Sequence, residues 1–122
     1  MEGTMSAKLL KVVKQALEEL NVDKLIELYA KNFLFEDIPF ELRITDRNAL
    51  KEYYRHLFSL PQASFSNIRV FEADNFAAIE WTWGGVSRTT GKPFQIQGAS
   101  VIELSDGKVK RESLYYDPKL AR

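Results

Sequence analysis

The stretch that decides the fold runs from Ser64 to Asp117 and reads SFSNIRVFEADNFAAIEWTWGGVSRTTGKPFQIQGASVIELSDGKVKRESLYYD. Within it, runs of strand-forming residues are separated by short polar segments that favour tight turns, namely Asp74-Asn75, Thr89-Thr90-Gly91-Lys92 and Ser105-Asp106-Gly107-Lys108. This alternation predicts four strands in an antiparallel meander. Gly84-Gly85 interrupts the second run and predicts a bulge that bends the sheet.

The residues before this stretch have the periodicity of helices. Apolar residues recur every three or four positions over residues 6–20, and a shorter helical pattern covers residues 25–33. A third pattern lies between Thr45-Asp46, which precede its start, and Pro61, which marks its end. Residues 33–38 are rich in strand formers and stop at Pro39, which predicts a short strand before the third helix.

Helices followed by long antiparallel strands predict an α+β fold. The helices would cover one face of the bent sheet, and a cavity would lie between the two layers. The chain has 122 residues, of which 45% are hydrophobic, and this is enough for one core. We therefore expect a single domain over residues 1–122, with a disordered start at residues 1–5.

Composition argues against several classes of function. The 17 basic and 17 acidic residues cancel, so no net field attracts nucleic acid or anionic membranes, and neither is an expected partner. Without cysteine and with His56 as the single histidine, the usual metal sites cannot form, and we expect no metal or other cofactor. No apolar run suits a leader or a membrane span, so we expect a cytoplasmic protein.

Strand parity suggests how the sheet is used. Trp81 and Trp83 share one side of their strand with Ile79, while Glu80 and Thr82 share the other with Phe76 and Ala78. Because helices can cover only one of these partly apolar faces, the other is expected to pack on a second subunit. We predict a homodimer through the face that carries Trp81 and Trp83.

The order of elements and several short motifs resemble the nuclear transport factor 2-like superfamily. The short strand ending in Glu-Asp-x-Pro, the run Trp81-Thr82-Trp83-Gly84, the turn at Gly91-Lys92-Pro93-Phe94 and the closing Tyr115-Tyr116-Asp117 are similar to its SnoaL-like branch, named for polyketide cyclases. The resemblance covers nearly the whole chain. It implies a cystatin-like, cone-shaped, curved mixed or antiparallel sheet, wrapped by three N-terminal helices around a pocket.

Within this superfamily, ketosteroid isomerase resembles the chain most closely at the site. Its general base falls on Asp37, and two supporting tyrosines fall on Tyr29 and Tyr54. Its two oxyanion donors fall on about Ala16 and Ser100, of which alanine donates nothing and serine is a weaker donor. The last-strand acid of the polyketide cyclases falls on Leu114. The resemblance thus implies the base but not the full isomerase site.

The chemistry of a dry carboxylate fits this role. Asp37 against apolar walls would lose hydration, which favours its protonated form and suits proton abstraction from carbon. Glu80, on the face taken to line the pocket, would be a second acid, or else a solvated group in a surface ion pair. Asp37 would otherwise only fix the loop before Pro39. Glu112 also points inward if Ser105–Gly107 form a bulged turn.

We therefore predict an apolar pocket that binds a small apolar or aromatic molecule, without a cofactor. Asp37, Tyr54 and Glu80 are the predicted catalytic residues. The predicted ligand-binding residues come from the helices and the three last strands: Tyr29, Phe58, Thr82, Ile96, Gly98, Ser100, Leu114 and Tyr116. Proton transfer by an isomerase-like or cyclase-like enzyme is the leading hypothesis. The alternative is a non-catalytic dimeric module for ligand binding or protein interaction.

Overall fold

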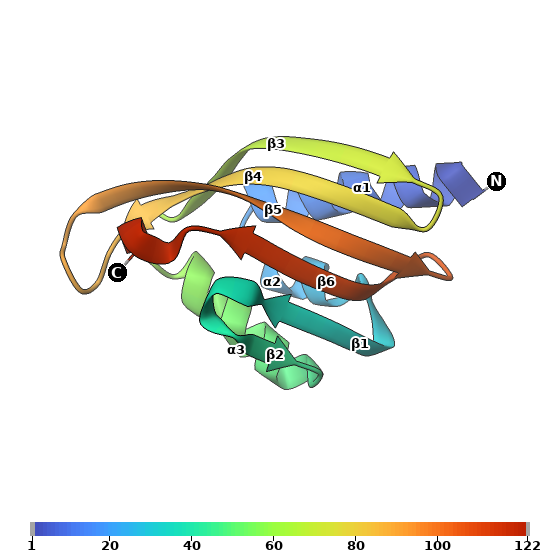
Figure 1. Ribbon diagram of the computed structural model, residues 1–122, viewed down its shortest axis with the longest axis horizontal. Helices are drawn as coiled ribbons and strands as arrows, with labels where there is room; N and C mark the ends of the chain where they lie inside the picture. The colour runs from blue at the N-terminus through green and yellow to red at the C-terminus, as the bar shows by residue number, and fades with distance from the viewer. Residues whose placement is uncertain (1, 122) are drawn as a thin grey trace.

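The computed structural model describes the backbone of residues 2–121 and the side chains of residues 8–119. Its elements in chain order are α1 (Glu2–Glu18), α2 (Val22–Ile26), β1 (Tyr29–Asp37), the 3-10 turn η1 (Ile38–Phe40), β2 (Leu42–Ile44), α3 (Arg47–Phe58), β3 (Ser64–Ala73), β4 (Phe76–Val86), β5 (Pro93–Ser105), β6 (Lys108–Tyr116) and the 3-10 turn η2 (Pro118–Ala121). Figure 1 shows the helices and strands with their labels.

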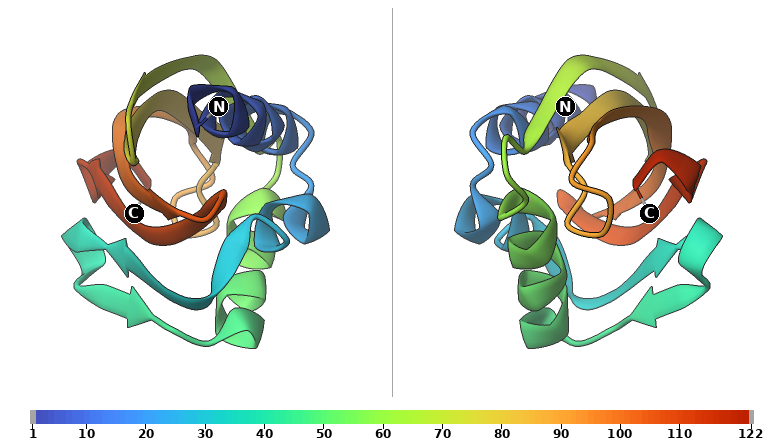
Figure 2. Two further views of the ribbon diagram at one scale, coloured as in Figure 1. Left: turned by 90° about the vertical axis from the view of Figure 1, so that its right-hand side faces the viewer. Right: turned by 90° about the vertical axis from the view of Figure 1, so that its left-hand side faces the viewer.

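The strands of the described chain form one mixed sheet in the order β2-β1-β6-β5-β4-β3. The four long strands β3 to β6 pair antiparallel in sequence order, which confirms the predicted meander. β1 adds to the edge of β6 in parallel, and β2 pairs antiparallel with β1. Seen end-on, the sheet curls without closing, and the helices lie along its open side (Figure 2). The predicted α+β fold is thereby confirmed.

The first and third helices lie where periodicity predicted them. The apolar stripe of α1, from Leu9 to Leu17, is buried in the core. In α3, the Asp46 side chain accepts a hydrogen bond of 2.9 Å from the amide of Ala49, which satisfies one of the free amides at the helix start. Leu50 and Tyr54 of α3 then point into the core.

The second helix is shorter than predicted. It ends at Ile26, and Tyr29 already begins β1, so the helical interpretation of residues 29–33 was wrong. Tyr29 pairs with Val109 of β6. Aromatic residues fit a pleated, half-buried surface, and pairing with a distant strand outweighed the local helical pattern.

The predicted bulge at Gly84-Gly85 was also wrong, because the β4–β5 register runs through both glycines without a shift. The irregularities lie instead between Ser66 and Arg69 in β3 and between Glu103 and Leu104 in β5. A Cβ at Gly84 would lie 2.9 Å from Ser64 Oγ, so this glycine permits close packing at the strand pair rather than a bend.

The two faces of the sheet are the reverse of the prediction. Trp81 and Trp83 are buried on the inner face under the helices, at 5% and 7% exposure, and Glu80 lies on the outer face. Directly opposite residues of an antiparallel pair share a face. Because Ser100 lies opposite Ile79 and Gly98 opposite Trp81, the face of Ser100 is also the face of the tryptophans.

At the N-terminus, α1 begins at Glu2, while Met1 lies outside the described residues. None of the helices in the described part of the chain has both the length and the apolar character needed to cross a membrane.

Candidate functional site

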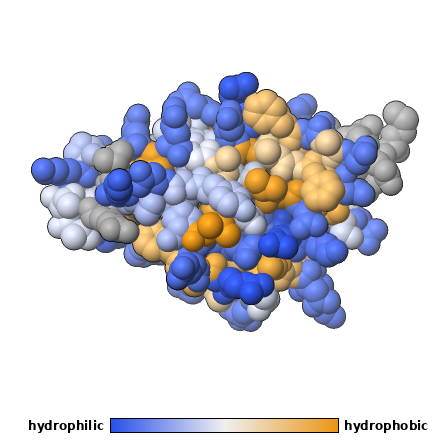
Figure 3. All heavy atoms as spheres, viewed as in Figure 1, coloured by the Kyte–Doolittle hydropathy of each residue, from blue (hydrophilic) through white to orange (hydrophobic). Residues whose placement is uncertain are grey.

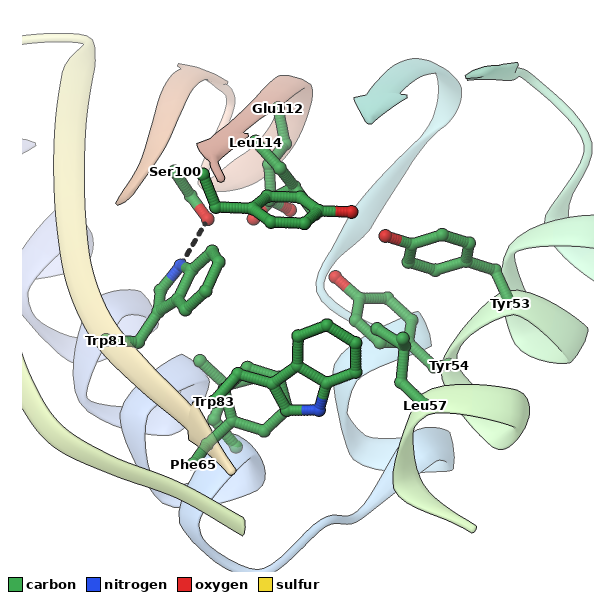
Figure 4. Close-up of a pocket in the computed structure, with 11 residues that line it drawn as sticks. Tyr53, Tyr54, Leu57, Phe65, Trp81, Trp83, Ser100, Glu112 and Leu114 are labelled. Atoms are coloured by element: carbon green, nitrogen blue, oxygen red, sulfur yellow. Dashed lines mark hydrogen bonds between the residues drawn. The ribbon is translucent and has the colours of Figure 1, made fainter. Parts of the chain in front are cut away.

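A cavity lies between α3, α1 and the inner face of the sheet. Its lining is mostly aromatic and comes from six elements: Leu17, Tyr53, Tyr54, Leu57, Phe65, Trp81, Trp83, Ser100, Glu112, Leu114 and Tyr116. Figure 4 shows the labelled side chains around a common space, with Glu112 and Ser100 on the side of the sheet and Tyr53 and Tyr54 on the side of α3. The volume of about 30 Å³ holds about one or two water molecules.

Glu112 is the one carboxyl group among the lining residues of the cavity. It is buried on β6, and the hydroxyl of Tyr29 donates a hydrogen bond to its Oε1 atom. The hydroxyls of Tyr29 and Tyr54 are 2.8 Å apart, so a chain of polar groups runs from β6 through β1 to α3. Burial raises the pKa of Glu112 above its ordinary value, although hydrogen bonds with Tyr29 and Ser100 oppose the rise.

Ser100 and Trp81 extend this polar edge of the cavity. The indole nitrogen of Trp81 donates a hydrogen bond of 3.0 Å to Ser100 Oγ, which Figure 4 marks with a dashed line. The six-membered ring of the same indole lies against Gly98, where a Cβ would approach Trp81 to 2.4 Å. The space above Gly98 is therefore filled by the protein's own tryptophan.

Asp37 forms a second buried polar group next to the cavity. It is 2% exposed and accepts hydrogen bonds from Tyr53 at 2.6 Å and from Tyr116 at 2.8 and 2.9 Å. Both tyrosines line the cavity, whereas Asp37 does not. Burial and the neighbouring Asp37 raise the pKa of Tyr53 and Tyr116, so both hydroxyls stay protonated and donate to the carboxylate.

Trp83 carries an unsatisfied polar atom. Its indole nitrogen is buried and has no acceptor among the described residues. A buried donor without a partner costs about 1–3 kcal/mol. A water molecule or an oxygen atom of a ligand next to Trp83 would remove that cost.

Four of the predicted site residues line the cavity, namely Tyr54, Ser100, Leu114 and Tyr116. Two more lie one layer behind them. Tyr29 contacts both Tyr54 and Glu112, and Phe58 packs between Tyr54 and Phe65 with ring centres 5.6 and 5.7 Å apart.

The remaining predictions do not fall at the cavity. The side chain of Glu80 is 51% exposed and pairs with Arg69 at 3.4 Å, so it is the solvated alternative. Thr82 and Ile96 border an open hollow on the outside of the sheet. Gly98 is covered by Trp81, as described above. Glu80 and Thr82 miss the cavity because the face assignment placed them on the same side as Ser100, whereas Ile96 and Gly98 do share the inner face with Ser100 but do not line the cavity.

Sequence reasoning missed the tryptophans, Tyr53 and Phe65 as lining residues, and it ranked Glu112 behind Glu80. The register shift between Glu103 and Leu104, beside the turn at Asp106-Gly107, is what brings Glu112 opposite Ile102 on the inner face. The expected bulged turn at Ser105–Gly107 was wrong, because Ser105 pairs with Lys108 across a two-residue turn and the extra residue lies in β6 at Lys110, which turns Glu112 inward all the same. Within the part of the chain that the structure describes, no three acidic or histidine side chains gather as a metal site would require.

Solved structures with this architecture are numerous, and three illustrate its range. A hypothetical protein with a ketosteroid isomerase-like fold from Catenulispora acidiphila, in complex with trimethylamine, is 16% identical with a TM-score of 0.80 over 93% of this chain and 88% of that one. A proposed isomerase from Bacillus subtilis is 25% identical with a TM-score of 0.77, covering 98% and 91%. A nuclear transport factor 2-like protein of unknown function from Burkholderia xenovorans is 22% identical with a TM-score of 0.77, covering 96% and 86%.

The curved sheet, the helical cover and these neighbours define an α+β protein of the nuclear transport factor 2-like class. More narrowly, the model of the SnoaL-like domain matches residues 11–112, and the chain belongs to this family. The resemblance found in the sequence is thereby confirmed. Among curated proteins, none matches the chain.

Proposed function

We propose that this SnoaL-like protein binds a small, largely apolar molecule in the cavity, whose lining side chains move apart to admit it, and transfers a proton to or from it. The observation that carries the proposal is the burial of Glu112 in an aromatic wall, where its raised pKa brings proton exchange closer to neutral pH. The complex of the Catenulispora protein with trimethylamine supports a small ligand for this fold.

Asp37 is the second acid of the proposal and the one that the resemblance to ketosteroid isomerase implies as general base. Its carboxylate meets the cavity through the hydroxyls of Tyr53 and Tyr116, which hydrogen-bond to it and line the cavity. Proton abstraction by Asp37 therefore requires one of these hydroxyls to pass the proton on or to turn aside. Glu112 needs no such step, since it borders the cavity itself. Two carboxyl groups in different surroundings suit an acid and a base.

The test uses a small β,γ-unsaturated ketone, 3-cyclohexenone, whose isomerisation to the conjugated ketone is followed by ultraviolet absorbance. We expect the protein to accelerate the reaction and Glu112→Gln to lower the rate by about 10²–10⁴-fold. Asp37→Asn reports on the second acid, and Glu80→Gln on the outer face is the matched control. Equal rates for all four proteins would exclude proton transfer by these carboxyl groups.

A second candidate function is a non-catalytic module. It is favoured by the small volume of the cavity, about 30 Å³, and by the way in which Trp81 covers Gly98. In this case the aromatic side chains form a closed core rather than a binding site. Small neutral and charged probes that leave the melting temperature unchanged would support this alternative.

A further inference from the structure

The walls of the cavity are unusually rich in aromatic rings. Six of its lining side chains are aromatic: Tyr53, Tyr54, Phe65, Trp81, Trp83 and Tyr116. Tyr116 lies 6.0 Å from Trp81 and 6.3 Å from Trp83 between ring centres, and it meets Trp83 almost at a right angle. Phe65 lies 5.7 Å from Trp81. Rings on several sides of one small space present both faces and edges to an occupant.

The charges around these rings all have one sign. Glu112 lines the cavity, and Asp37 lies directly behind the hydroxyls of Tyr53 and Tyr116. No lysine, arginine or histidine is among the lining residues of the described chain. A tyrosine that donates a hydrogen bond to a carboxylate becomes more electron-rich, because hydrogen bonds polarise one another in a low-dielectric interior. Electron-rich aromatic faces and carboxylates both attract cations.

We propose that the cavity, whose lining side chains move apart to admit a ligand larger than water, selects a small organic cation, an alkylammonium ion of the size of methylammonium to trimethylammonium, over a neutral molecule of the same shape. This inference rests on the proposed binding of a small molecule at the same site. The aromatic rings supply cation–π contacts to the alkyl groups, as in aromatic cages for quaternary ammonium ligands. Glu112 supplies the counter-charge at the edge of the cavity.

Binding of such a cation is coupled to the protonation of Glu112. The groups that face this carboxyl group are the hydroxyls of Tyr29 from β1 and Ser100 from β5. The hydroxyl of Tyr54 from α3 is hydrogen-bonded to that of Tyr29. All three are neutral, so a cation in the cavity is the partner that favours the ionised form. The ligand therefore releases a proton from Glu112 when it binds, and its affinity rises with pH.

The probes are trimethylammonium chloride and tert-butanol, a neutral molecule of similar size. Both tryptophans of the chain line the cavity, so intrinsic fluorescence reports binding directly. We expect trimethylammonium to bind at least about tenfold more tightly than tert-butanol, a difference of about 1.4 kcal/mol. The dissociation constant of trimethylammonium should decrease as the pH is raised from about 5 to about 8. The alkylamine stays protonated over this range.

Glu112→Gln should weaken trimethylammonium binding about tenfold and remove its pH dependence, and it should change tert-butanol binding much less. Glu80→Gln, on the outer face, should change neither. Binding of tert-butanol equal to or tighter than that of the cation would overturn the cation proposal and leave small-molecule binding standing. Absence of binding by both probes would overturn both proposals in favour of the closed core.

Discussion

Glu112 is a carboxyl group without a cationic partner inside an aromatic cavity, and its burial has a cost. Its contacts are the hydroxyls of Tyr29 and Ser100, which stabilise a carboxylate less than an ion pair would. The raised pKa means that the folded protein holds the proton of Glu112 more tightly than the unfolded chain does. Protonation of this residue is therefore linked to stability.

The sign of that linkage gives a prediction. Because the folded-state pKa of Glu112 lies above its ordinary value of 4.5, its contribution to stability is complete below that value and is lost as the pH rises through the folded-state pKa. Glu112→Gln should remove this loss. Chemical denaturation across the pH range should thus show a difference in unfolding free energy, variant minus wild type, that grows with pH.

Glu36 acts in the opposite direction, since hydrogen bonds from Ser113 and Arg111 lower its pKa. The contribution of Glu36 to stability is lost as the pH falls. The pH dependence of the wild-type unfolding free energy alone would therefore combine the effects of Glu36 and Glu112. Comparison with the variant isolates Glu112, and Glu80→Gln provides an exposed control. If the difference in unfolding free energy between Glu112→Gln and wild type stays constant with pH, Glu112 has the same proton affinity in the folded and unfolded states.

At the scale of the elements, the pairing of β4 with β5 organises the cavity. Gly98 lies opposite Trp81, and because glycine has no side chain, the indole can occupy the space next to it. The indole in turn reaches Ser100, two residues further along β5. The position of the largest ring in the site thus depends on a glycine in the neighbouring strand.

Gly98→Ala should therefore destabilise the protein by about 1–3 kcal/mol, because the new Cβ would lie 2.4 Å from an atom of a rigid ring. The measurement is the denaturation midpoint at constant slope. In a Trp81→Leu background the same substitution should cost clearly less, since the clashing ring is gone. An equal cost in both backgrounds would attribute the effect to the backbone of β5 instead.

The same strand pair shows what the sequence could and could not predict. Turn residues and apolar periodicity were sufficient for the meander and for α3, because both signals are local. Asp37, Tyr54 and Ser100 were found through the resemblance to a known family. Which face of β4 points into the core was not found. Trp81 and Glu80 point to opposite sides of the strand in any case, and only the pairing of Trp81 with Gly98 decides which of the two points inward.

Tyr29 illustrates a second limit. Its spacing from Leu25 and Ile26 fits a helix, and the strand formers that predicted a strand begin only at Phe33. Its partners are Val109 in the sheet and Glu112 in the cavity, about 80 residues further along the chain. Contacts at that separation cannot be read from local periodicity.

At the scale of the whole molecule, the outer face of the sheet is the apolar surface that has no cover. Phe71, Phe76, Val101 and Tyr115 are each about half exposed on it. Figure 3 looks onto this side and shows hydrophobic atoms gathered among hydrophilic ones. The tryptophans that were expected there are inside, but the reasoning that one sheet face needs a partner applies to the outer face unchanged.

We accordingly predict a homodimer through the outer face, with Val101 near its centre. Val101 lies in one register row with Ala78 and Phe71. Val101→Glu should convert the dimer to a folded monomer, because a charge at an apolar interface loses hydration without gaining a partner. Sedimentation velocity measures the change, and Leu42→Glu on the distant strand β2 is the control. A wild-type protein that sediments as a monomer would contradict the prediction.

The parallel pairing of β1 with β6 joins two distant parts of the chain, since Asp37 lies opposite Leu114. A ribosome makes the three helices and β1 long before β6 emerges, so the acid-bearing strand stays without its neighbour until the four-strand meander has been made. Throughout that interval the nascent polypeptide has no sheet to cover the apolar sides of its helices, which are buried in the folded protein.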